Sequence, residues 1–490
     1  MIERSPIFRY RSLVDKLVRL IDSGVLRPGD RLPSLRQFSR QEKASVTTVL
    51  QAYGLLESQG YIQAKPQSGY FVRARDIARP AEPSVSAPCR NITPVDVGSV
   101  VAAVLRNGQN LNLVPLGTAS PGSALLPTRV LDRLLTAQIR RCARLQAQDY
   151  SYPPGEHELR RQIARRSRDW GGQLASDDII ITSGATQAID LCLRAVTRPG
   201  DIVAIESPCY FGTLLLLETL GLSVLEIPAH PRSGIRLDNL ADALASHPVR
   251  ACVVSPCFSN PLGSCMDDMA KRELLGLLVR RDIPLIEDDT YGDLSYTEIR
   301  PKPAKAFDDD GLVMLCSSFS KILAPGYRVG WTAPGRFHDQ VERLQLASTL
   351  AVPKIFQGTI TDFLESGAYD RHLRRIRTAA SVQSRQMAER IGTYFPPGTR
   401  VTRPSGGLLL WVELSEGIDS ISLSERAIAE GIGVCPGPLF SATGQYRNYI
   451  RLNAGSPWSP AMDRAIRRLG ELVHEQQPPP GDRKKESSRL

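Results

Sequence analysis

The sequence predicts an α/β protein in which a small helical unit precedes a mainly parallel sheet covered by helices on both faces. From about residue 111 onward, apolar runs typical of buried strands alternate with amphipathic stretches typical of helices, and this alternation favours a parallel sheet. Residues 1–73 show helical patterns that end in a short β pattern. A proline-, serine- and alanine-rich stretch separates the two blocks.

Pattern and composition divide the chain into four parts. We expect an amino-terminal unit at 1–73, a linker at 74–110, a large domain at 111–476 and a disordered polar tail at 477–490. The prolines of R-P-A-E-P-S-V-S-A-P favour an extended linker. The clearest predicted strands of the large domain are 179–182, 202–205, 251–254, 284–287 and 313–316.

Composition excludes several classes of protein. No run of roughly 18 apolar residues occurs, so we expect no membrane span. The amino terminus lacks an apolar signal core, which predicts a cytoplasmic protein. The nine cysteines are scattered without a C-x-x-C pair, which argues against a disulfide framework and against a zinc site.

Positive charge is concentrated in the amino-terminal unit. The whole chain carries +10, and residues 1–80 hold fourteen Lys and Arg against seven Asp and Glu, a surplus of +7. A small basic unit indicates a polyanionic partner, although a merely solvated surface would look the same.

The amino-terminal unit reads as three helices and a hairpin. Pro33 and Ser34 are residues that start helices, and another helical pattern runs over 43–61. The apolar residues at helical spacing that we expect to face its core are Val46, Val49, Leu50, Tyr53 and Leu56. The polar residues expected on the opposite side, free for a ligand, are Ser45, Thr47, Thr48 and Gln51. Two short strands within 61–72 complete a winged helix-turn-helix, whose third helix enters the DNA major groove.

The spacing of L-P-S-x-R, S-x-T-T-V and S-G-Y-F-V resembles the GntR family of bacterial regulators. The resemblance implies double-stranded DNA as partner, with contacts from Arg36, Ser45, Thr47, Thr48 and Gly69. The family often has arginines where this chain has Val46 and Leu50. We therefore expect phosphate contacts to carry more of the affinity, from Arg36, Arg40, Lys43 and Lys65. A three-helix packing module without a ligand is the alternative.

Polar residues follow several predicted strands of the large domain, at the edge where such folds bind ligands. A strand, a glycine turn and a helix start at 179–191 offer backbone N–H groups to an anion, although a purely structural turn would look the same. The loop residues of the other strands are Tyr210, Asn260 and the acids of E-D-D at 287–289.

The segment S-F-S-K, with an arginine seven residues after the lysine, completes a set of groups that suits pyridoxal 5′-phosphate (PLP). This cofactor needs a lysine for its aldehyde, a carboxylate for its ring nitrogen, a phosphate cradle and a planar side chain against its ring. The sequence supplies all four, so we interpret Lys321 as the lysine that forms an imine with PLP. A surface lysine is the alternative.

Residues of about 111–476 resemble a fold-type I PLP-dependent transferase domain, similar to aspartate aminotransferase, with a smaller carboxyl-terminal α+β subdomain. The resemblance implies that Lys321 is catalytic, that Asp288 pairs with the ring nitrogen, and that Tyr210 stacks on the ring. Implied ring-hydroxyl contacts are Tyr291 and Asn260. Implied phosphate contacts are Ala185 (backbone), Thr186, Ser318, Arg328 and, from the other subunit, Tyr150.

Two assignments have alternatives. Asp289 could replace Asp288 as the ring partner, or it could be a solvated neighbour. Asp288 is favoured because Tyr291, three residues after it, then fits the family pattern. The resemblance implies that Arg451 binds a substrate carboxylate together with Asn260, but Arg451 could instead pair with a structural acid. We expect the loop L-G-T-A-S-P-G at 116–122 to contribute to side-chain specificity.

A GntR-type unit joined to such a domain resembles the MocR group of regulators. The resemblance implies a homodimer with exchanged DNA-binding heads and an effector that is PLP, an amine or an amino acid. A working aminotransferase that uses an amino acid and a 2-oxo acid is the second hypothesis. A PLP-holding scaffold without regulation or turnover is the third.

Overall fold

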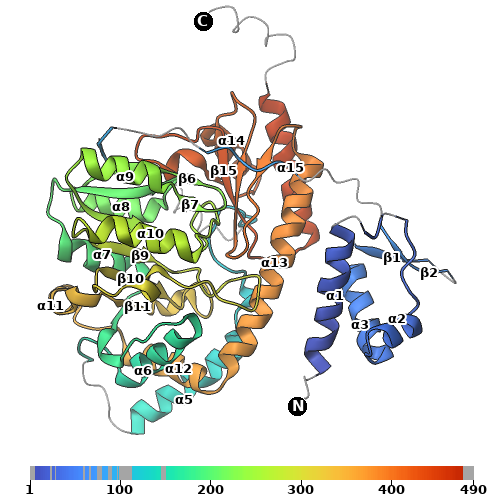
Figure 1. Cartoon of the computed structure of the whole chain (residues 1–490), viewed down its shortest axis with the longest axis horizontal. Coiled ribbons are helices and arrows are strands. Elements are labelled where there is room, and N and C mark those ends of the chain that lie inside the picture. Colours follow the sequence, from blue (N-terminus) through green and yellow to red (C-terminus); the bar gives the residue numbers. More distant parts are fainter. Residues whose placement is uncertain are drawn as a thin grey trace, which may run out of the picture. The chain divides into compact units, whose positions relative to one another are not determined.

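The chain folds into two compact units, Met1–Ala78 and Arg79–Leu490 (Figure 1). The computed structural model describes residues 6–22, 25–27, 29–58, 61–65, 68–73, 80–85, 91–96, 98, 113–144 and 151–477. The predicted tail at 477–490 lies almost entirely outside the described residues, as do parts of the expected linker.

The smaller unit is the predicted winged helix-turn-helix. Its elements are α1 (Pro6–Asp22), α2 (Leu35–Gln41), α3 (Val46–Ser58), β1 (Ile62–Lys65) and β2 (Gly69–Val72). The strands pair antiparallel, with Ile62 opposite Val72. The Ser34 hydroxyl caps α2 by accepting a hydrogen bond from the Gln37 N–H at 3.2 Å. Val49, Tyr53 and Leu56 of α3 are fully buried in the core of this unit.

Three residues of α3 lie on the side opposite to the one predicted. Val46 and Leu50 are 45% and 48% exposed, so they do not belong to the core. Thr48 is buried, and the Ser45 hydroxyl preceding the helix forms hydrogen bonds with both the Thr48 N–H (3.1 Å) and the Thr48 hydroxyl (2.7 Å). Apolar residues occupy a wide sector of α3, so helical spacing alone does not tell which of them pack in the core and which face solvent.

The central sheet of the larger unit is mixed and mostly parallel. Its strand order is β3-β6-β5-β8-β9-β10-β11-β4, with β7 paired to β6. Strands β6, β5, β8, β9 and β10 run parallel, and β3, β7 and β11 run antiparallel to their neighbours. The bounds are β3 (Thr93–Pro94), β4 (Ile180–Thr182), β5 (Ile202–Ser207), β6 (Ser223–His230), β7 (Gly234–Ile235), β8 (Val249–Val254), β9 (Leu285–Asp288), β10 (Val313–Ser318) and β11 (Gly330–Ala333).

Helices cover both faces of this sheet, as the alternating pattern predicts. Successive strand residues point to opposite faces, so Val203 packs in one apolar cluster and Ala204 in another. Helices α7 (Ala185–Val196), α8 (Phe211–Thr219) and α11 (His338–Ser348) contribute to the first cluster. Helices α9 (Leu237–Ser246) and α10 (Asp268–Val279) contribute to the second.

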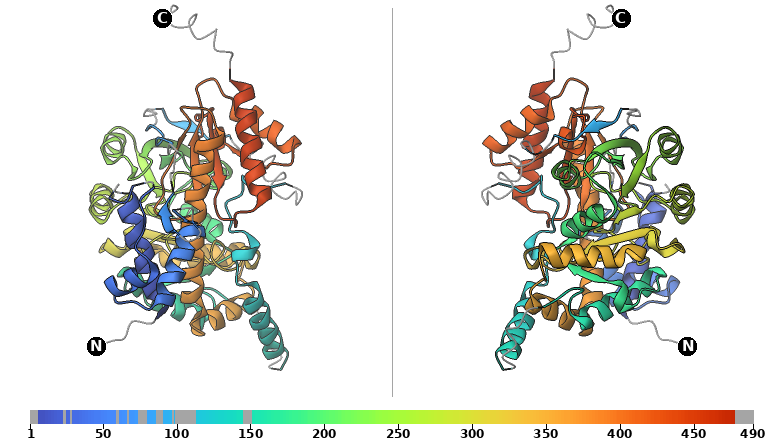
Figure 2. Two further views of the ribbon diagram at one scale, coloured as in Figure 1. Left: turned by 90° about the vertical axis from the view of Figure 1, so that its right-hand side faces the viewer. Right: turned by 90° about the vertical axis from the view of Figure 1, so that its left-hand side faces the viewer.

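A smaller α+β subdomain follows the sheet along the chain. Its antiparallel sheet has the order β12-β13-β15-β14, formed by β12 (Arg400–Val401), β13 (Leu409–Glu413), β15 (Tyr449–Asn453) and β14 (Cys435–Pro436). Its helices are α14 (Ser420–Ala429) and α15 (Pro460–Gln476), and the long α13 (Ala368–Tyr394) leads into it. Other α-helices among the described residues are α5 (Thr128–Arg144), α6 (His157–Ser167) and α12 (Lys354–Glu365). Figure 2 shows α5 projecting from the body of the larger unit.

The described parts of the expected linker are held against the larger unit. Ala81 accepts a hydrogen bond from the Val401 N–H at 2.8 Å, and Glu82 forms an ion pair with Arg232 at 2.5 Å. β3 then adds an edge strand beside β6. Among the described residues, every helix is too short or too polar to cross a membrane.

Candidate functional site

The candidate site lies where adjacent parallel strands of the larger unit end. Strands β5, β8, β9 and β10 are neighbours, and their carboxyl ends meet at one edge of the sheet. Each end carries one of the residues that the sequence indicated: Tyr210, Asn260, Asp288 and Lys321. The fold therefore brings together side chains that are more than 100 positions apart in the sequence.

Lys321 has an environment unlike that of a surface lysine. Its pKa is lowered to about 8, first because burial penalises the ammonium form, and also because the charges of Arg451 and Arg328 repel it. The Asp288 carboxylate acts in the opposite sense. A lysine with such a pKa holds a sizeable neutral fraction near neutral pH, and the neutral amine is the nucleophile.

The two neighbouring acids have different partners. Asp289 is bound to the buried Arg300, which also donates from Nε to Asp293 at 2.5 Å. Asp288 instead accepts hydrogen bonds from the Thr290 N–H (3.0 Å) and the Thr290 hydroxyl, and it interacts electrostatically with Lys321. Burial raises the pKa of Asp288, and both Thr290 and Lys321 counteract that effect. This arrangement favours Asp288 over Asp289 as the group that faces a cofactor beside Lys321.

Backbone close to Arg328 forms an anion cradle. Gly184 has φ +84° and precedes α7, whose amino terminus has no side-chain cap. A Cβ at Gly184 would collide with the Arg328 guanidinium, and a Cβ at Gly330 would collide with the Gly184 backbone. These glycines let the guanidinium and the start of α7 approach each other, where backbone N–H groups and a cation can hold one anion.

The other predicted phosphate contacts differ in their burial and in their hydrogen bonds. Ala185 is the first residue of α7, and Thr186, which follows it, is exposed. Ser318 is buried at the end of β10, and its hydroxyl accepts from the Ser320 N–H at 3.4 Å. Ser320, which the sequence reasoning missed, accepts from Arg328 Nη1 at 3.0 Å and so orients the guanidinium. Tyr150 lies outside the described residues.

Arg451 lies buried on β15 and points its guanidinium toward the site. It donates to Asn260 Oδ1 at 3.1 Å and to the Gly117 carbonyl at 2.7 Å. Its Nε is buried without a hydrogen-bond partner among the described residues. Both acceptors, the Asn260 amide oxygen and the Gly117 carbonyl, are uncharged. The Arg451 guanidinium can therefore bind the carboxylate of a ligand.

Aromatic rings complete the site. Tyr210 directly precedes α8, and its ring lies so close to Gly212 that a Cβ there would collide with it. Tyr291 is buried and donates from its hydroxyl to the Ala119 carbonyl at 3.1 Å. The rings of Phe211 and Phe440 lie against the Arg451 guanidinium. The loop at 116–122 therefore contacts the site through two backbone carbonyls, which no side-chain pattern could have revealed.

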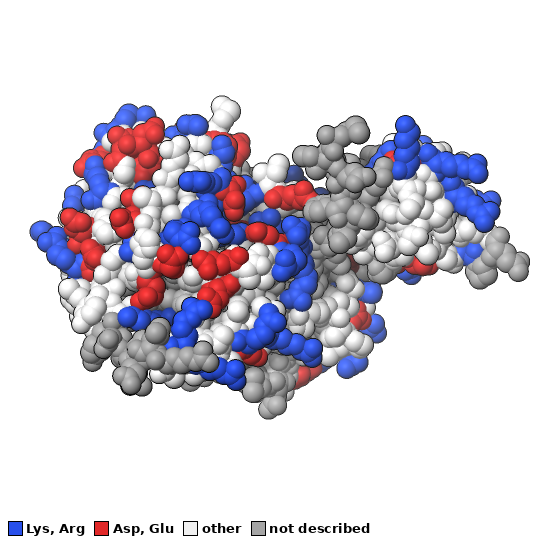
Figure 3. Space-filling model, turned by 90° about the horizontal axis from the view of Figure 1, so that it is seen from below, with Lys and Arg blue, Asp and Glu red and all other residues white. Residues whose placement is uncertain are grey.

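Four of the five predicted DNA contacts lie on the surface of the smaller unit. Arg36, Ser45, Thr47 and Gly69 are exposed, whereas Thr48 is buried beside Ser45. The cations suggested as phosphate contacts, Arg36, Arg40, Lys43 and Lys65, are all exposed. Figure 3 shows the surface of the smaller unit with several groups of Lys and Arg and little Asp or Glu.

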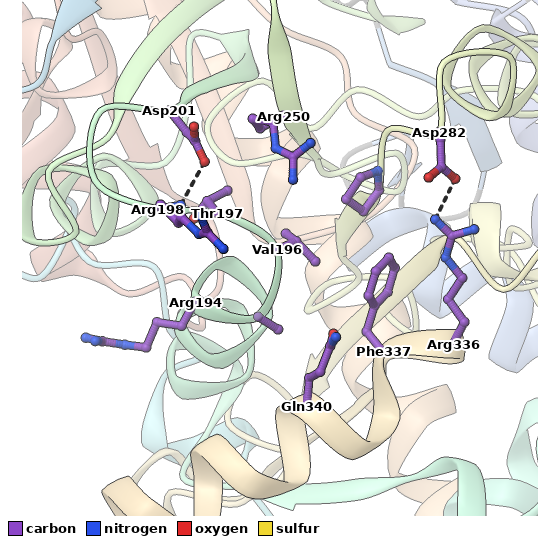
Figure 4. Close-up of a pocket in the computed structure, with 12 residues that line it drawn as sticks. Arg194, Val196, Thr197, Arg198, Asp201, Arg250, Asp282, Arg336, Phe337 and Gln340 are labelled. Carbon is purple, nitrogen blue, oxygen red and sulfur yellow. Dashed lines mark hydrogen bonds and ion pairs between the residues drawn. The ribbon is translucent and has the colours of Figure 1, made fainter.

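A separate hollow of about 470 Å³ opens at the other edge of the central sheet (Figure 4). Its lining includes Arg198, Asp201 and Arg250, which lie where strands begin rather than end. Several of its charged groups already have partners, for example Arg336 with Asp282 at 2.5 Å. It is therefore distinct from the site around Lys321.

Comparison with known proteins gives a consistent result for both units. Residues 122–469 match the family "Aminotransferase class I and II", and residues 9–72 match "Bacterial regulatory proteins, gntR family". The chain is 40% identical over 470 residues to the HTH-type transcriptional regulator YjiR of Escherichia coli K12, covering 95% of this chain and 99% of that protein. It is 38% identical over 467 residues, with the same coverage of both chains, to the HTH-type transcriptional regulator YdcR of the same organism.

Solved aminotransferase structures resemble about three quarters of the chain. The kynurenine aminotransferase of Pyrococcus horikoshii has a TM-score of 0.71 and 30% identity, covering 78% of this chain and 95% of that structure. The α-aminoadipate aminotransferase LysN of Thermus thermophilus, complexed with N-(5′-phosphopyridoxyl)-L-leucine, has a TM-score of 0.71 and 26% identity, covering 77% of this chain and 94% of that structure.

Proposed function

We propose that this chain binds DNA and senses an amine through bound PLP. The chain belongs to the aminotransferase class I and II family and carries a gntR-family domain at its amino terminus. This combination of domains is that of a MocR-type regulator. The observation that carries the proposal is that one chain holds both a unit suited to DNA and a site suited to a small-molecule cofactor. A basic winged helix-turn-helix precedes a domain whose partly buried Lys321 has a pKa of about 8. A purely metabolic enzyme has no need for the first of these.

The residues of the larger unit fit PLP. The cradle of Gly184, Arg328 and the start of α7 suits a phosphate dianion, since it offers a cation and free backbone N–H groups. Asp288 is an acid next to Lys321, suited to a protonated ring nitrogen. Arg451, with its buried unpartnered Nε, suits the carboxylate of an amino acid, together with Asn260.

When bound, PLP supplies an aldehyde for which Lys321 and an incoming amine compete, and a ring that withdraws electrons. Arg451 orients an amino acid by its carboxylate, and Tyr210 limits the ring to one plane. Lys321, once displaced, is an amine with a lowered pKa that can accept or return a proton. Its altered charge changes the interactions with Asp288, Arg328 and Arg451.

Regulation requires that the liganded and free states differ in DNA affinity. An effector shifts such an equilibrium only by its differential affinity for the two states, typically about 1–3 kcal/mol. We propose a homodimer that presents two winged helices to paired half-sites and exchanges its DNA-binding heads. The contact proposed for Tyr150 would come from the second subunit of this dimer.

A working aminotransferase is the second candidate. The set Lys321, Asp288, Arg328 and Arg451 favours it, since no group that transamination requires is missing from the described site. The 2-aminoadipate transaminase of Thermus thermophilus is 29% identical over 76% of this chain. YdcR and YjiR, which match 95% of this chain, are named as transcriptional regulators, and this makes the aminotransferase the weaker candidate.

An absorbance titration tests the proposal. Protein loaded with PLP should show a visible band that borohydride abolishes, and Lys321→Ala should lack it. A panel of amino acids is then added, and the amine that shifts the band is the effector or the substrate. Stoichiometric shift without 2-oxo acid release supports a sensor, whereas sustained release of a 2-oxo acid supports the enzyme. A wild-type protein that never shows the band would overturn the cofactor assignment.

A further inference from the structure

The recognition helix α3 carries an exposed apolar stripe, defined here as Val46 and Leu50. Both side chains are about half exposed, whereas Val49, Tyr53 and Leu56 of the same helix are fully buried. The stripe residues are four positions apart, so they are neighbours on the helix surface. Of the three large exposed apolar side chains described in the smaller unit, two belong to this stripe and the third is Val25.

The core of the smaller unit does not include these two side chains. The core of the unit is formed without them, by α1, α2, the opposite face of α3 and the hairpin. Single exposed apolar residues are common on protein surfaces. An adjacent pair near the amino terminus of the helix that enters the major groove is placed where residues reach base edges.

Cations lie on both sides of the stripe along the sequence. Arg36 and Arg40 belong to α2, Lys43 precedes α3, and Lys65 ends the first strand of the wing. All four are exposed, and none of them forms an ion pair with another described residue. An apolar stripe flanked by cations matches a groove whose floor carries methyl groups and whose walls carry phosphates.

We propose, resting on the DNA-binding function above, that Val46 and Leu50 read thymine methyl groups in the major groove. Thymine is the base that presents a methyl group there, and apolar side chains recognise it by contact. Arginine at these positions would donate to guanine instead. The half-site therefore contains thymine at the positions that face Val46 and Leu50.

The test begins with selection of binding sites. Full-length protein loaded with PLP selects duplexes from a random library, and each thymine shared by the selected sites is replaced singly by deoxyuridine, which lacks only the methyl group. Removing a contacted methyl should weaken binding about fourfold, because burial of one such carbon contributes about 0.8 kcal/mol. In Leu50→Ala, the methyl effect should disappear at the one thymine that Leu50 contacts, so that the thymine and deoxyuridine duplexes bind equally. In Val46→Ala, the effect should disappear at a different thymine.

Control variants separate the outcomes. Val25→Ala changes a more exposed apolar residue outside α3 and should retain the full effect of the methyl group. Alanine is a strong helix former, so the α3 variants should fold normally. Selected sites without shared thymines, or a deoxyuridine effect that persists in both α3 variants, would overturn the stripe as a thymine reader while leaving DNA binding intact. Failure to select any DNA would overturn both this inference and the proposed function.

Discussion

The charged groups that we propose for function lie in opposite environments in the two units. In the smaller unit, cations such as Arg36, Arg40 and Lys43 are exposed around a single apolar core. In the larger unit, Lys321 interacts with both Asp288 and the buried Arg451, and the Arg300 side chain is buried against Asp289. Exposed charges act through solvent over roughly 10 Å and are screened by salt, whereas buried charges shift each other's pKa values.

This difference teaches which variable controls each unit. Ionic strength should govern the smaller unit, since counterion release dominates contacts with phosphates. pH and the identity of nearby charges should govern the larger unit. The predictions below test that division, from the largest expected effect to the smallest.

Salt should change DNA affinity by orders of magnitude. Four exposed cations in each of two heads give about eight phosphate contacts, so affinity should fall roughly 10³- to 10⁵-fold between 50 and 200 mM salt. Fluorescence anisotropy with the selected duplex measures the slope of log affinity against log salt. Lys43→Ala in both heads should reduce the magnitude of this slope by about 2. A slope near zero would contradict the electrostatic account of the smaller unit.

Arg300 should be essential for the stability of the larger unit. Arg300→Met leaves Asp289 without its buried partner, which costs about 3–5 kcal/mol of unfolding free energy. The matched control is Arg426→Met, whose ion pair with Glu475 is solvent-exposed and should contribute less than about 1 kcal/mol. Urea unfolding of the larger unit, followed by circular dichroism, compares the two. Equal losses would show that the burial of the first pair has no consequence.

The anion cradle should tolerate no side chain at Gly184. Gly184→Ala displaces the Arg328 guanidinium, and loss of one charged hydrogen bond weakens PLP binding about 10- to 150-fold. Gly200→Ala is the control: its φ of +92° imposes similar backbone strain, but a Cβ there meets no atom within 4 Å. Equilibrium dialysis with PLP gives both affinities. Equal weakening in the two variants would mean that backbone strain, rather than the cradle, causes the loss.

The rate of PLP attachment should follow the ionisation of Lys321. The neutral amine reacts, so below the lowered pKa of about 8 the rate should rise about tenfold per pH unit and level off above it. Arg451 lowers this pKa by repulsion, so Arg451→Gln should move the midpoint upward and slow attachment at pH 7 severalfold. Stopped-flow absorbance across pH 6–10 measures both curves. A midpoint that Arg451→Gln leaves unchanged or lowers would contradict the proposed electrostatic interaction.

The sequence was most informative where periodicity and loop position decide the structure. The alternating pattern predicted the parallel sheet, and the strand ends placed Tyr210, Asn260, Asp288 and Lys321 at one edge. Ser34 as the cap of α2 followed from residue type alone. Such features depend on local chain properties and on the rule that parallel strands end together.

Features that depend on tertiary packing could not be predicted in the same way. Helical spacing placed Val46 and Leu50 in the core, but the core of the unit is filled without them. Thr48 was expected to be free, yet it serves the start of α3 together with Ser45. Ser320 and the carbonyls of Gly117 and Ala119 contact site residues through hydrogen bonds that only the folded chain brings together.

The central claim is that the state of Lys321 controls DNA binding by the other unit. The most direct measurement is the affinity of the PLP-loaded protein for its selected duplex, with and without the amine that shifts the absorbance band. We predict a change of about 5- to 150-fold for the wild type, the range of typical coupling free energies, and no change for Lys321→Ala, which should still bind DNA. Equal affinity in the wild type with and without saturating amine, accompanied by release of a 2-oxo acid, would contradict the account and favour the aminotransferase.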